Sequence, residues 1–164
     1  MNSALSHTST QREKYLLYKC HGELFGTPLS GIREIVPFQI PLRVPNTHKD
    51  YLGIVNVRGD IAGVVDLRFW FNDERIISKE REPQALLVVD SQAGLMAIAV
   101  DTVEGISELF DHEIETPTGM PETIAEDGMI GIGKFAQGLV TLLNLKALCV
   151  ATDVVIEHKE RRVS

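Results

Sequence analysis

The residues best able to do chemistry in this chain are its histidines, and they are scattered. Only His112 has acidic neighbours on both sides, in the run Asp111-His112-Glu113. Such a trio could bind a metal ion or serve in acid–base chemistry, but a site of that kind needs groups that converge from several segments. The pattern therefore favours a polar loop between strands. Binding of a metal or small ligand through this loop is the alternative hypothesis.

The motifs of common catalytic sites are missing from the sequence. There is no nucleophile elbow, P-loop or GxGxxG run. The glycine-rich stretch 128–133 precedes a predicted strand, so it lacks the helix N-terminus that holds phosphate. Cys20 and Cys149 are the only cysteines, too few for a disulfide framework or a zinc motif. We therefore expect no enzymatic activity, no cofactor and no metal.

The amino-acid composition limits the fold class and the partners of the protein. The chain has 164 residues, of which 44% are hydrophobic but only 6% aromatic, so its core must rest on Val, Ile and Leu, which favours strands. The net charge of −7 argues against nucleic acid and anionic membrane surfaces as partners. No run approaches the roughly 18–20 apolar residues of a membrane span, and the Ser/Thr-rich start lacks the apolar core of a signal peptide. We expect a soluble, cytoplasmic protein without direct membrane insertion.

Short apolar runs predict an all-β fold. Residues 1–13 read as a disordered tail and 151–164 as a C-terminal tail. Three prolines between 37 and 45 exclude a helix there. Residues 72–84 are charged and read as a loop, and Asn144 can cap a short helix over 145–149. The predicted strands cover 15–20, 24–29, 31–36, 51–57, 61–67, 86–89 and 95–100, with a further hairpin in 131–145.

The stretch 53–68 predicts a β-hairpin with polar residues at chosen points. Its two β-rich runs flank a tight turn, for which Gly59-Asp60 can supply the positive φ that a two-residue loop needs. Arg58 and Asp60 lie at the tip, and Asn56 and Asp66 lie along the ribbon. A generic hairpin of this kind would be structural, with a solvated tip.

Two segments of the first half are repeated in the second. Residues 95–106 match 24–35, and residues 131–145 match 53–67, which aligns Gly131 with Gly53 and Asn144 with Asp66. Self-similarity of this kind indicates a duplicated architecture. We therefore predict two halves, about 14–82 and 83–150, each forming a small barrel of about five strands, packed on each other around a shared apolar core.

The amino-acid sequence of the hairpin resembles the signature of the CheW-like family, the coupling proteins of bacterial chemotaxis. Gly63 stands where the family usually has proline, which frees the local backbone. Supporting likeness comes in order from 25–26, 43–46, 100–101, 103–106 and 131–145, so the resemblance covers one domain over 14–150. The residues that match the signature are Gly53, Asn56, Arg58, Gly59, Val64, Val65, Asp66, Leu67 and Arg68.

The resemblance implies a fold, a function and partners. The family fold is two SH3-like five-stranded β-barrels around a shared apolar core, without catalytic activity. Its members link the cytoplasmic tips of chemoreceptors to the C-terminal regulatory domain of a histidine kinase. By this likeness the chain would be a non-catalytic scaffold in bacterial chemotaxis and motility, recruited from the cytoplasm to membrane receptor arrays.

The resemblance also implies two binding surfaces. Ile32 and Glu34 lie two apart in an extended run and so share a face. A role without a partner is also open for both residues: Ile32 could pack in the core, and Glu34 could serve only solubility. Arg58 could instead pair with Asp60 or Asp66 and brace the hairpin. The implied kinase-binding residues are Ile32, Glu34, Arg43 and Val44, and the implied receptor-binding residues are Gly53, Arg58, Val103 and Ile106.

Overall fold

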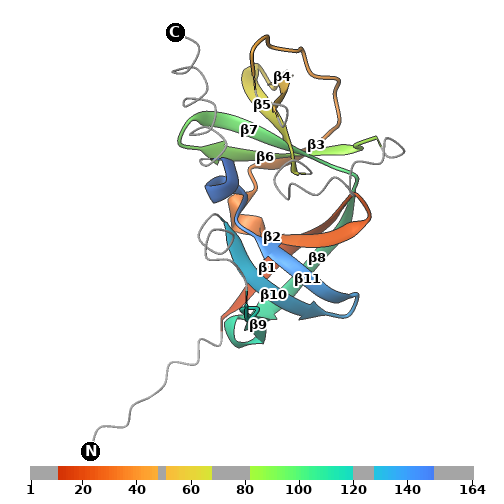
Figure 1. Cartoon of the computed structure of the whole chain (residues 1–164), viewed down its shortest axis with the longest axis vertical. Helices are drawn as coiled ribbons and strands as arrows, with labels where there is room; N and C mark the ends of the chain where they lie inside the picture. Colours follow the sequence, from red (N-terminus) through yellow and green to blue (C-terminus); the bar gives the residue numbers. More distant parts are fainter. Residues whose placement is uncertain (1–10, 48–50, 68–81, 120–127, 150–164) are drawn as a thin grey trace, which may run out of the picture.

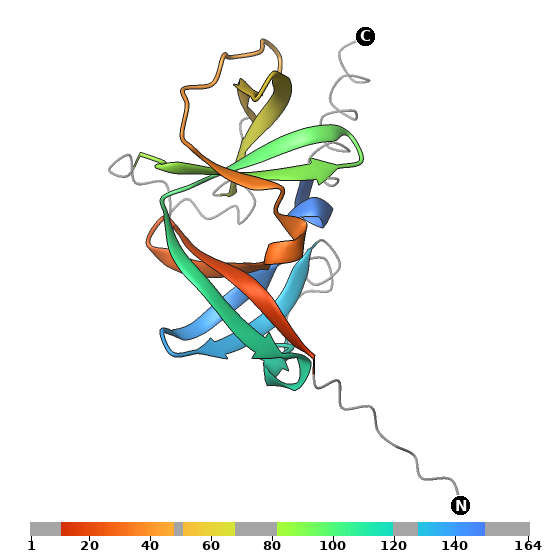
Figure 2. The same cartoon turned by 180° about the vertical axis from the view of Figure 1, so that it is seen from behind.

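The protein consists of two strongly curved β-sheets stacked one above the other (Figure 1, Figure 2). The computed structural model describes residues 11–47, 51–67, 82–119 and 128–149. The expected tail 151–164, residues 1–10 of the expected tail 1–13, and most of the expected loop 72–84 lie outside the described residues. Residues 12 and 13, expected in the tail, instead begin the first strand.

The lower sheet in Figure 1 has six strands in the order β8-β1-β2-β11-β10-β9. The upper sheet has five strands in the order β3-β6-β7-β5-β4. The six strands are β1 (Arg12–Cys20), β2 (Glu23–Pro28), β8 (Thr102–Phe110), β9 (Ile114–Glu115), β10 (Met129–Phe135) and β11 (Gly138–Leu143). The five are β3 (Glu34–Pro37), β4 (Tyr51–Val57), β5 (Asp60–Asp66), β6 (Ala85–Ser91) and β7 (Gly94–Val100). The all-β class with two barrel-like units is thus confirmed.

The two sheets share one topology, which confirms the internal repeat. When β1, β2, β3, β4 and β5 are matched in order with β6, β7, β8, β10 and β11, the lower order β8-β1-β2-β11-β10 becomes the upper order β3-β6-β7-β5-β4. Each sheet contains one parallel contact at the corresponding place, β2 with β11 and β7 with β5. The sheets do not coincide with the expected halves 14–82 and 83–150, however, because each combines strands from both.

The sheets differ from the expected halves because the two halves of the chain exchange strands around their hairpins. The first hairpin of the chain, β1–β2, has two open edges, which are filled by β8 and β11 from the second half. The hairpin β6–β7 in turn fills its edges with β3 and β5 from the first half. Unpaired edges are a liability in sheets, and the exchange satisfies them while linking both halves of the chain into one unit.

Gly53 and Gly131 occupy equivalent positions in the repeat. Each lies at a register shift within its hairpin, after Tyr51 in β4 and after Met129 in β10. Their φ angles are +137° and +155°. A Cβ on Gly53 would lie 2.2 Å from the carbonyl oxygen of Leu42, and one on Gly131 would lie 2.9 Å from that of Glu115. Both glycines thus allow a crossing strand to approach, Leu42 in one unit and β9 in the other.

The buried side chains form three groups, one of which is shared by the two sheets. Strands β1, β5, β6 and β7 are apolar on both faces, so alternate side chains enter different groups. The group of the lower sheet is Tyr15, Leu17, Leu109, Val140 and Leu142. The group of the upper sheet is Val55, Val57, Ala62, Val64, Leu86, Val88, Ala97 and Ala99. The third group takes Leu16 and Tyr18 from the lower sheet and Leu87 and Ile98 from the upper sheet, and is the predicted shared core.

A short helix over 145–149 closes the shared core, as predicted. Leu145, Leu148 and Cys149 are buried in it. The Asn144 Oδ1 accepts a hydrogen bond from the Ala147 N–H at 3.3 Å, and the Asn144 carbonyl accepts the first helical bond from Leu148. Asn144 therefore caps the helix and satisfies one of the N–H groups that a helix start leaves without a partner.

Candidate partner-binding surfaces

The tip of the β4–β5 hairpin presents Arg58 to solvent. The sequence predicted a loop at Gly59-Asp60, but Val57 pairs with Asp60, so the two loop residues are Arg58 and Gly59. Arg58 has a φ of +51°, which is uncommon for a residue with a side chain. The Asn56 Oδ1 supports this turn by accepting a hydrogen bond from the Gly59 N–H at 2.8 Å. The polar pattern of the hairpin thus holds Arg58 in a defined place.

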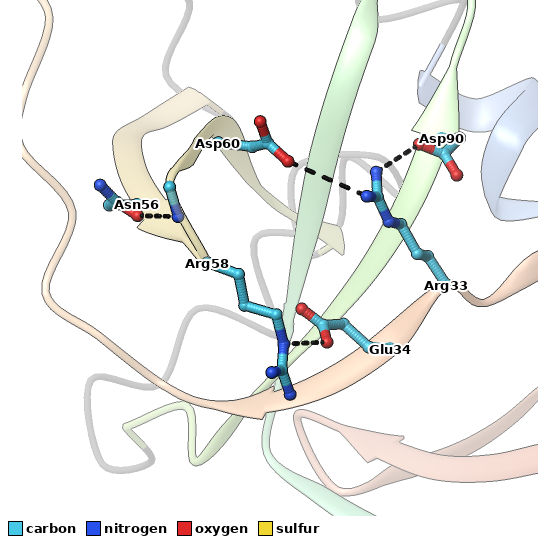
Figure 3. Close-up of polar contacts among 7 residues, drawn as sticks. Arg33, Glu34, Asn56, Arg58, Asp60 and Asp90 are labelled. Atoms are coloured by element: carbon cyan, nitrogen blue, oxygen red, sulfur yellow. Dashed lines mark hydrogen bonds and ion pairs between the residues drawn. The ribbon is translucent and has the colours of Figure 1, made fainter.

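Arg58 belongs to a cluster of charges that spans the turn and β3 (Figure 3). Its Nε donates to the Glu34 Oε2 at 2.7 Å. The neighbouring Arg33 donates to the Asp90 Oδ1 at 3.0 Å and lies 3.9 Å from the Asp60 carboxylate. We call these five residues the charged cluster. Among the described residues, Arg58 forms its ion pair with Glu34 and not with Asp60 or Asp66, so Glu34 takes the place of the bracing partner expected from the sequence.

Exposed apolar side chains adjoin the charged cluster in the chain. Ile35 follows Glu34, and Ile61 follows Asp60; both are exposed. Arg43 and Val44 are also exposed and follow Leu42, which forms a β-bridge to Ile54 at the edge of β4. Exposed apolar groups beside ion pairs are the composition of protein interfaces rather than of a closed core.

Ile32 and Gly53 lie deeper than the other predicted contact residues. Ile32 is half-buried and packs against the shared core, which agrees with the core role left open from the sequence. Glu34 and Val36 are also half-buried, but Val36 packs against the group of the upper sheet and Glu34 pairs with Val88 of that group, so the expected common face of Ile32 and Glu34 is not found. Gly53 is buried beneath Leu42, where its missing side chain has a structural reason.

The other predicted receptor-binding residues lie on the lower sheet. Val103 and Ile106 are three apart in β8, a spacing that would normally place them on opposite faces. A bulge restores a common face: Val103 pairs with Tyr18 and Ile106 with Leu16, while Glu104 has no partner in the register. Tyr18 and Leu16 both face the shared core. Val103 and Ile106 continue that face and are 38% and 56% exposed.

The structure does not support a ligand site at Asp111-His112-Glu113. These residues form a single 3-10 turn. The Glu113 Oε2 accepts a hydrogen bond from the Phe110 N–H at 2.8 Å, and the His112 ring stacks on the Phe110 ring at 5.3 Å. Glu113 and His112 therefore serve the local structure at the end of β8. Within the described ranges, the group of side chains with the spacing of metal ligands lies elsewhere, at Cys20, His21 and Asp66.

Sequence reasoning missed several members of these surfaces. Arg33 and Asp90 complete the charged cluster, and no spacing in the sequence links them, since they lie 57 residues apart. The described residues contain no helix of the length and apolar character needed to span a membrane.

Comparison with known proteins identifies the family and agrees with the fold. The family model described as a CheW-like domain matches residues 14–152. Among similar proteins, the chemotaxis protein CheW of Klebsiella aerogenes is 22% identical and the match covers 90% of this chain and 87% of that protein. CheW of Bacillus subtilis is 26% identical, with 81% and 82% covered. The crystal structure of the scaffolding protein TtCheW from Thermoanaerobacter tengcongensis aligns with a TM-score of 0.72 at 23% identity, over 84% of this chain and 92% of that one.

The fold is a pair of β-barrel-like units of the kind seen in that structure. The family match extends over most of the sequence, and the chain belongs to the CheW-like family. It is therefore an adaptor of chemotaxis signal transduction rather than an enzyme. The resemblance read from the hairpin signature is confirmed.

Proposed function

We propose that this chain joins the cytoplasmic tips of chemoreceptors to the C-terminal regulatory domain of a chemotaxis histidine kinase, at receptor arrays on the cytoplasmic side of the membrane. The observation that carries the proposal is the presence of two exposed surfaces on different sheets. One contains the charged cluster on the upper sheet, and the other contains Val103 and Ile106 on the lower sheet. An adaptor that holds two partners at once needs two such separate surfaces.

The upper surface is proposed to bind the kinase. We assign Glu34, Arg43 and Val44 to it, because Arg43 and Val44 are exposed and Glu34 belongs to the charged cluster; Ile32, which packs against the shared core, would support it from below. Exposed Ile35 follows Glu34 in β3 and offers an apolar group on the opposite face of this edge strand, while the Glu34 side chain is 22% exposed. An exposed apolar group and a cluster of charges at one edge of a sheet suit a specific contact between proteins.

The lower surface is proposed to bind the receptor. Val103 and Ile106 extend the apolar face of β1 beyond the shared core, so a helix from a partner could cover them without any change in the core. A helix that lays its apolar side on such a strip is a common mode of peptide recognition. Gly53 contributes to the scaffold by shape rather than by contact, because it is buried.

The ion pair between Arg58 and Glu34 joins two residues that are assigned to different partners. The guanidinium is 81% exposed and still offers donors to a partner, while its Nε holds Glu34. Reversal of either charge also leaves the other without its partner. A single substitution at Glu34 or Arg58 therefore shows which partner is lost, but not whether the side chain contacts that partner or only holds the other residue in place. The double charge exchange E34R/R58E separates these two cases.

The experiment is affinity purification of the tagged full chain from its native cells, with copurified proteins identified by mass spectrometry. We compare Glu34→Lys, Arg58→Glu and the double exchange with Val103→Glu and Ile106→Glu. Lys134→Glu is the matched control for charge reversal, since Lys134 also forms an exposed ion pair, with Glu115 at 3.1 Å. Leu139→Glu is the matched control for the apolar sites, since Leu139 is 69% exposed on β11.

The proposal expects the kinase to be lost with Glu34→Lys while receptors remain, and receptors to be lost with Ile106→Glu while the kinase remains. If the double exchange restores binding of the kinase, the ion pair serves to hold the surface in shape. If it restores no binding, Glu34 or Arg58 contacts a partner directly. Both controls should retain both partners. Loss of both partners in every variant of one surface, with intact folding, would contradict the assignment of separate surfaces.

A further inference from the structure

A buried group of potential metal ligands lies where the two sheets meet. Cys20 ends β1 of the lower sheet, His21 opens the following turn, and Asp66 ends β5 of the upper sheet. One ligand atom from each residue lies within 4.8 Å of the others. The side chains of His21 and Asp66 are 4% and 2% exposed. Thus a thiol, an imidazole and a carboxylate from two sheets converge in a space that is nearly closed to water.

The spacing of the three ligand atoms is close to that found around a metal ion. The His21 Nε2 and the Asp66 Oδ1 are 3.9 Å apart, which is longer than a hydrogen bond. Two ligands at the usual bond lengths to tetrahedral zinc are about 3.4 Å apart, so only a small movement of these side chains would close them on an ion. A carboxylate as buried as that of Asp66 is stabilised when a cation is bound beside it.

The surrounding structure fixes the turn that carries the histidine. The Asp101 Oδ2 accepts a hydrogen bond from the Gly22 N–H at 3.3 Å, and the Asp101 N–H donates to the Lys19 carbonyl at 2.8 Å. His21 and Gly22 are the two loop residues, with φ of +53° and +81°. The His21 side chain is buried while the residue as a whole is half-buried, so the backbone of this turn reaches solvent directly beside the ligand group.

We propose that Cys20, His21 and Asp66 form a zinc site that fastens the two sheets together. The donor set selects the metal: thiolate and imidazole suit zinc, and a carboxylate is an accepted third ligand, with water in the fourth position. Binding would deprotonate the thiol and release its proton to solvent. The site would connect the end of β1 to the end of β5, which belong to different sheets, and so stabilise their packing.

The test uses the full chain with its affinity tag removed. The chain is loaded with Zn²⁺, desalted and assayed for bound metal, and a second sample is loaded with Co²⁺, whose thiolate charge-transfer absorption reports a cysteine ligand. The variants are Cys20→Ser and Asp66→Asn. Cys149→Ser is the matched control, since Cys149 is also buried in the shared core but lies outside the ligand group. His112→Ala controls for an exposed histidine.

We expect one zinc per chain, a thiolate band with cobalt, and a rise in the thermal midpoint on loading, because a ligand that binds only the folded state stabilises it. Cys20→Ser and Asp66→Asn should lose all three effects, and the two controls should keep them. Substoichiometric zinc in the wild-type chain, or a thiolate band that disappears with Cys149→Ser, would overturn the proposal. If a ligand variant does not fold, as judged by circular dichroism, the wild-type and Cys149→Ser spectra decide. The outcome is independent of partner binding.

Discussion

Leu42 crosses so close to Gly53 that substitution of this glycine is expected to lower the stability of the fold strongly. The Leu42 N–H donates to the Ile54 carbonyl, and the Ile54 N–H donates back to Leu42, both at 2.9 Å. This two-bond bridge passes so close to Gly53 that an added Cβ would lie 2.2 Å from the Leu42 carbonyl oxygen. Gly53→Ala should therefore break the bridge and also strain the backbone, whose φ of +137° strongly favours glycine.

The magnitude follows from these two costs. A residue with a side chain in a rarely populated φ region costs about 1–3 kcal/mol. Loss of two backbone hydrogen bonds costs about 0.5–1.5 kcal/mol each. The free energy of unfolding should thus fall by about 2–6 kcal/mol, a large part of the roughly 5–15 kcal/mol of a typical domain.

Other glycines of the chain separate the two costs. Gly31 lacks a positive φ and has open space around its Cβ position, so Gly31→Ala should change stability by less than about 0.5 kcal/mol. Gly59 has a φ of +90° but also open space, so Gly59→Ala should show the backbone strain alone, about 1–2 kcal/mol. Gly131→Ala meets Ile114 at 2.7 Å and should fall between Gly59→Ala and Gly53→Ala.

The assay is equilibrium unfolding in urea, followed by far-ultraviolet circular dichroism, with the slope of the transition compared among variants. The expected loss of stability increases from Gly31→Ala through Gly59→Ala and Gly131→Ala to Gly53→Ala. A loss for Gly53→Ala no larger than that for Gly59→Ala would refute the reasoning, because it would mean that the crossing of Leu42 adds nothing.

Three further predictions concern single side chains. Arg58→Glu should change the free energy of unfolding by less than about 1 kcal/mol in urea unfolding, because exposed ion pairs contribute little; a larger loss would make Arg58 mainly structural. Asn144→Ala should cost about 1 kcal/mol in the same assay through loss of the helix cap, and an unchanged midpoint would show that the cap contributes nothing. Burial raises the pKa of Tyr15 from 10.0 to about 12, with smaller contributions from Glu13 and Asp111. Because the folded state disfavours the phenolate, its contribution to stability is present below pH 10 and is lost as the pH rises toward 12, and Tyr15→Phe should lessen the loss of stability over that window in unfolding curves measured at each pH.

Much of the fold could be predicted because its information is local. Alternating apolar residues and turn glycines placed the hairpins, and the match of Gly131 to Gly53 predicted the repeat. The exchange of hairpins could not be predicted, because the pattern of β1 and β6 shows that both faces are buried but not which edge receives which strand. The turn of β4–β5 was shifted by one residue, because Arg58 takes a positive φ that residue type alone does not favour.

The candidate surfaces could be predicted only in part. The family resemblance pointed to Glu34 and Arg58 but placed them with different partners, and only the folded chain brings them to 2.7 Å. The common face of Val103 and Ile106 depends on a bulge that spacing alone conceals. Asp66 was visible as a polar residue in the hairpin, but its approach to Cys20 and His21 arises from the packing of the two sheets.

The central claim is that the chain bridges two partners, and reconstitution tests it most directly. Membranes that contain the native chemoreceptors are mixed with the purified histidine kinase, with or without the full chain, and the kinase that sediments with the membranes is measured. The account predicts that sedimentation requires the chain and is lost with Glu34→Lys or Ile106→Glu, and that a mixture of these two variants does not restore it, because each molecule must hold both partners. Sedimentation of the kinase that does not change when the chain is added, or that the mixture of variants restores, would contradict it.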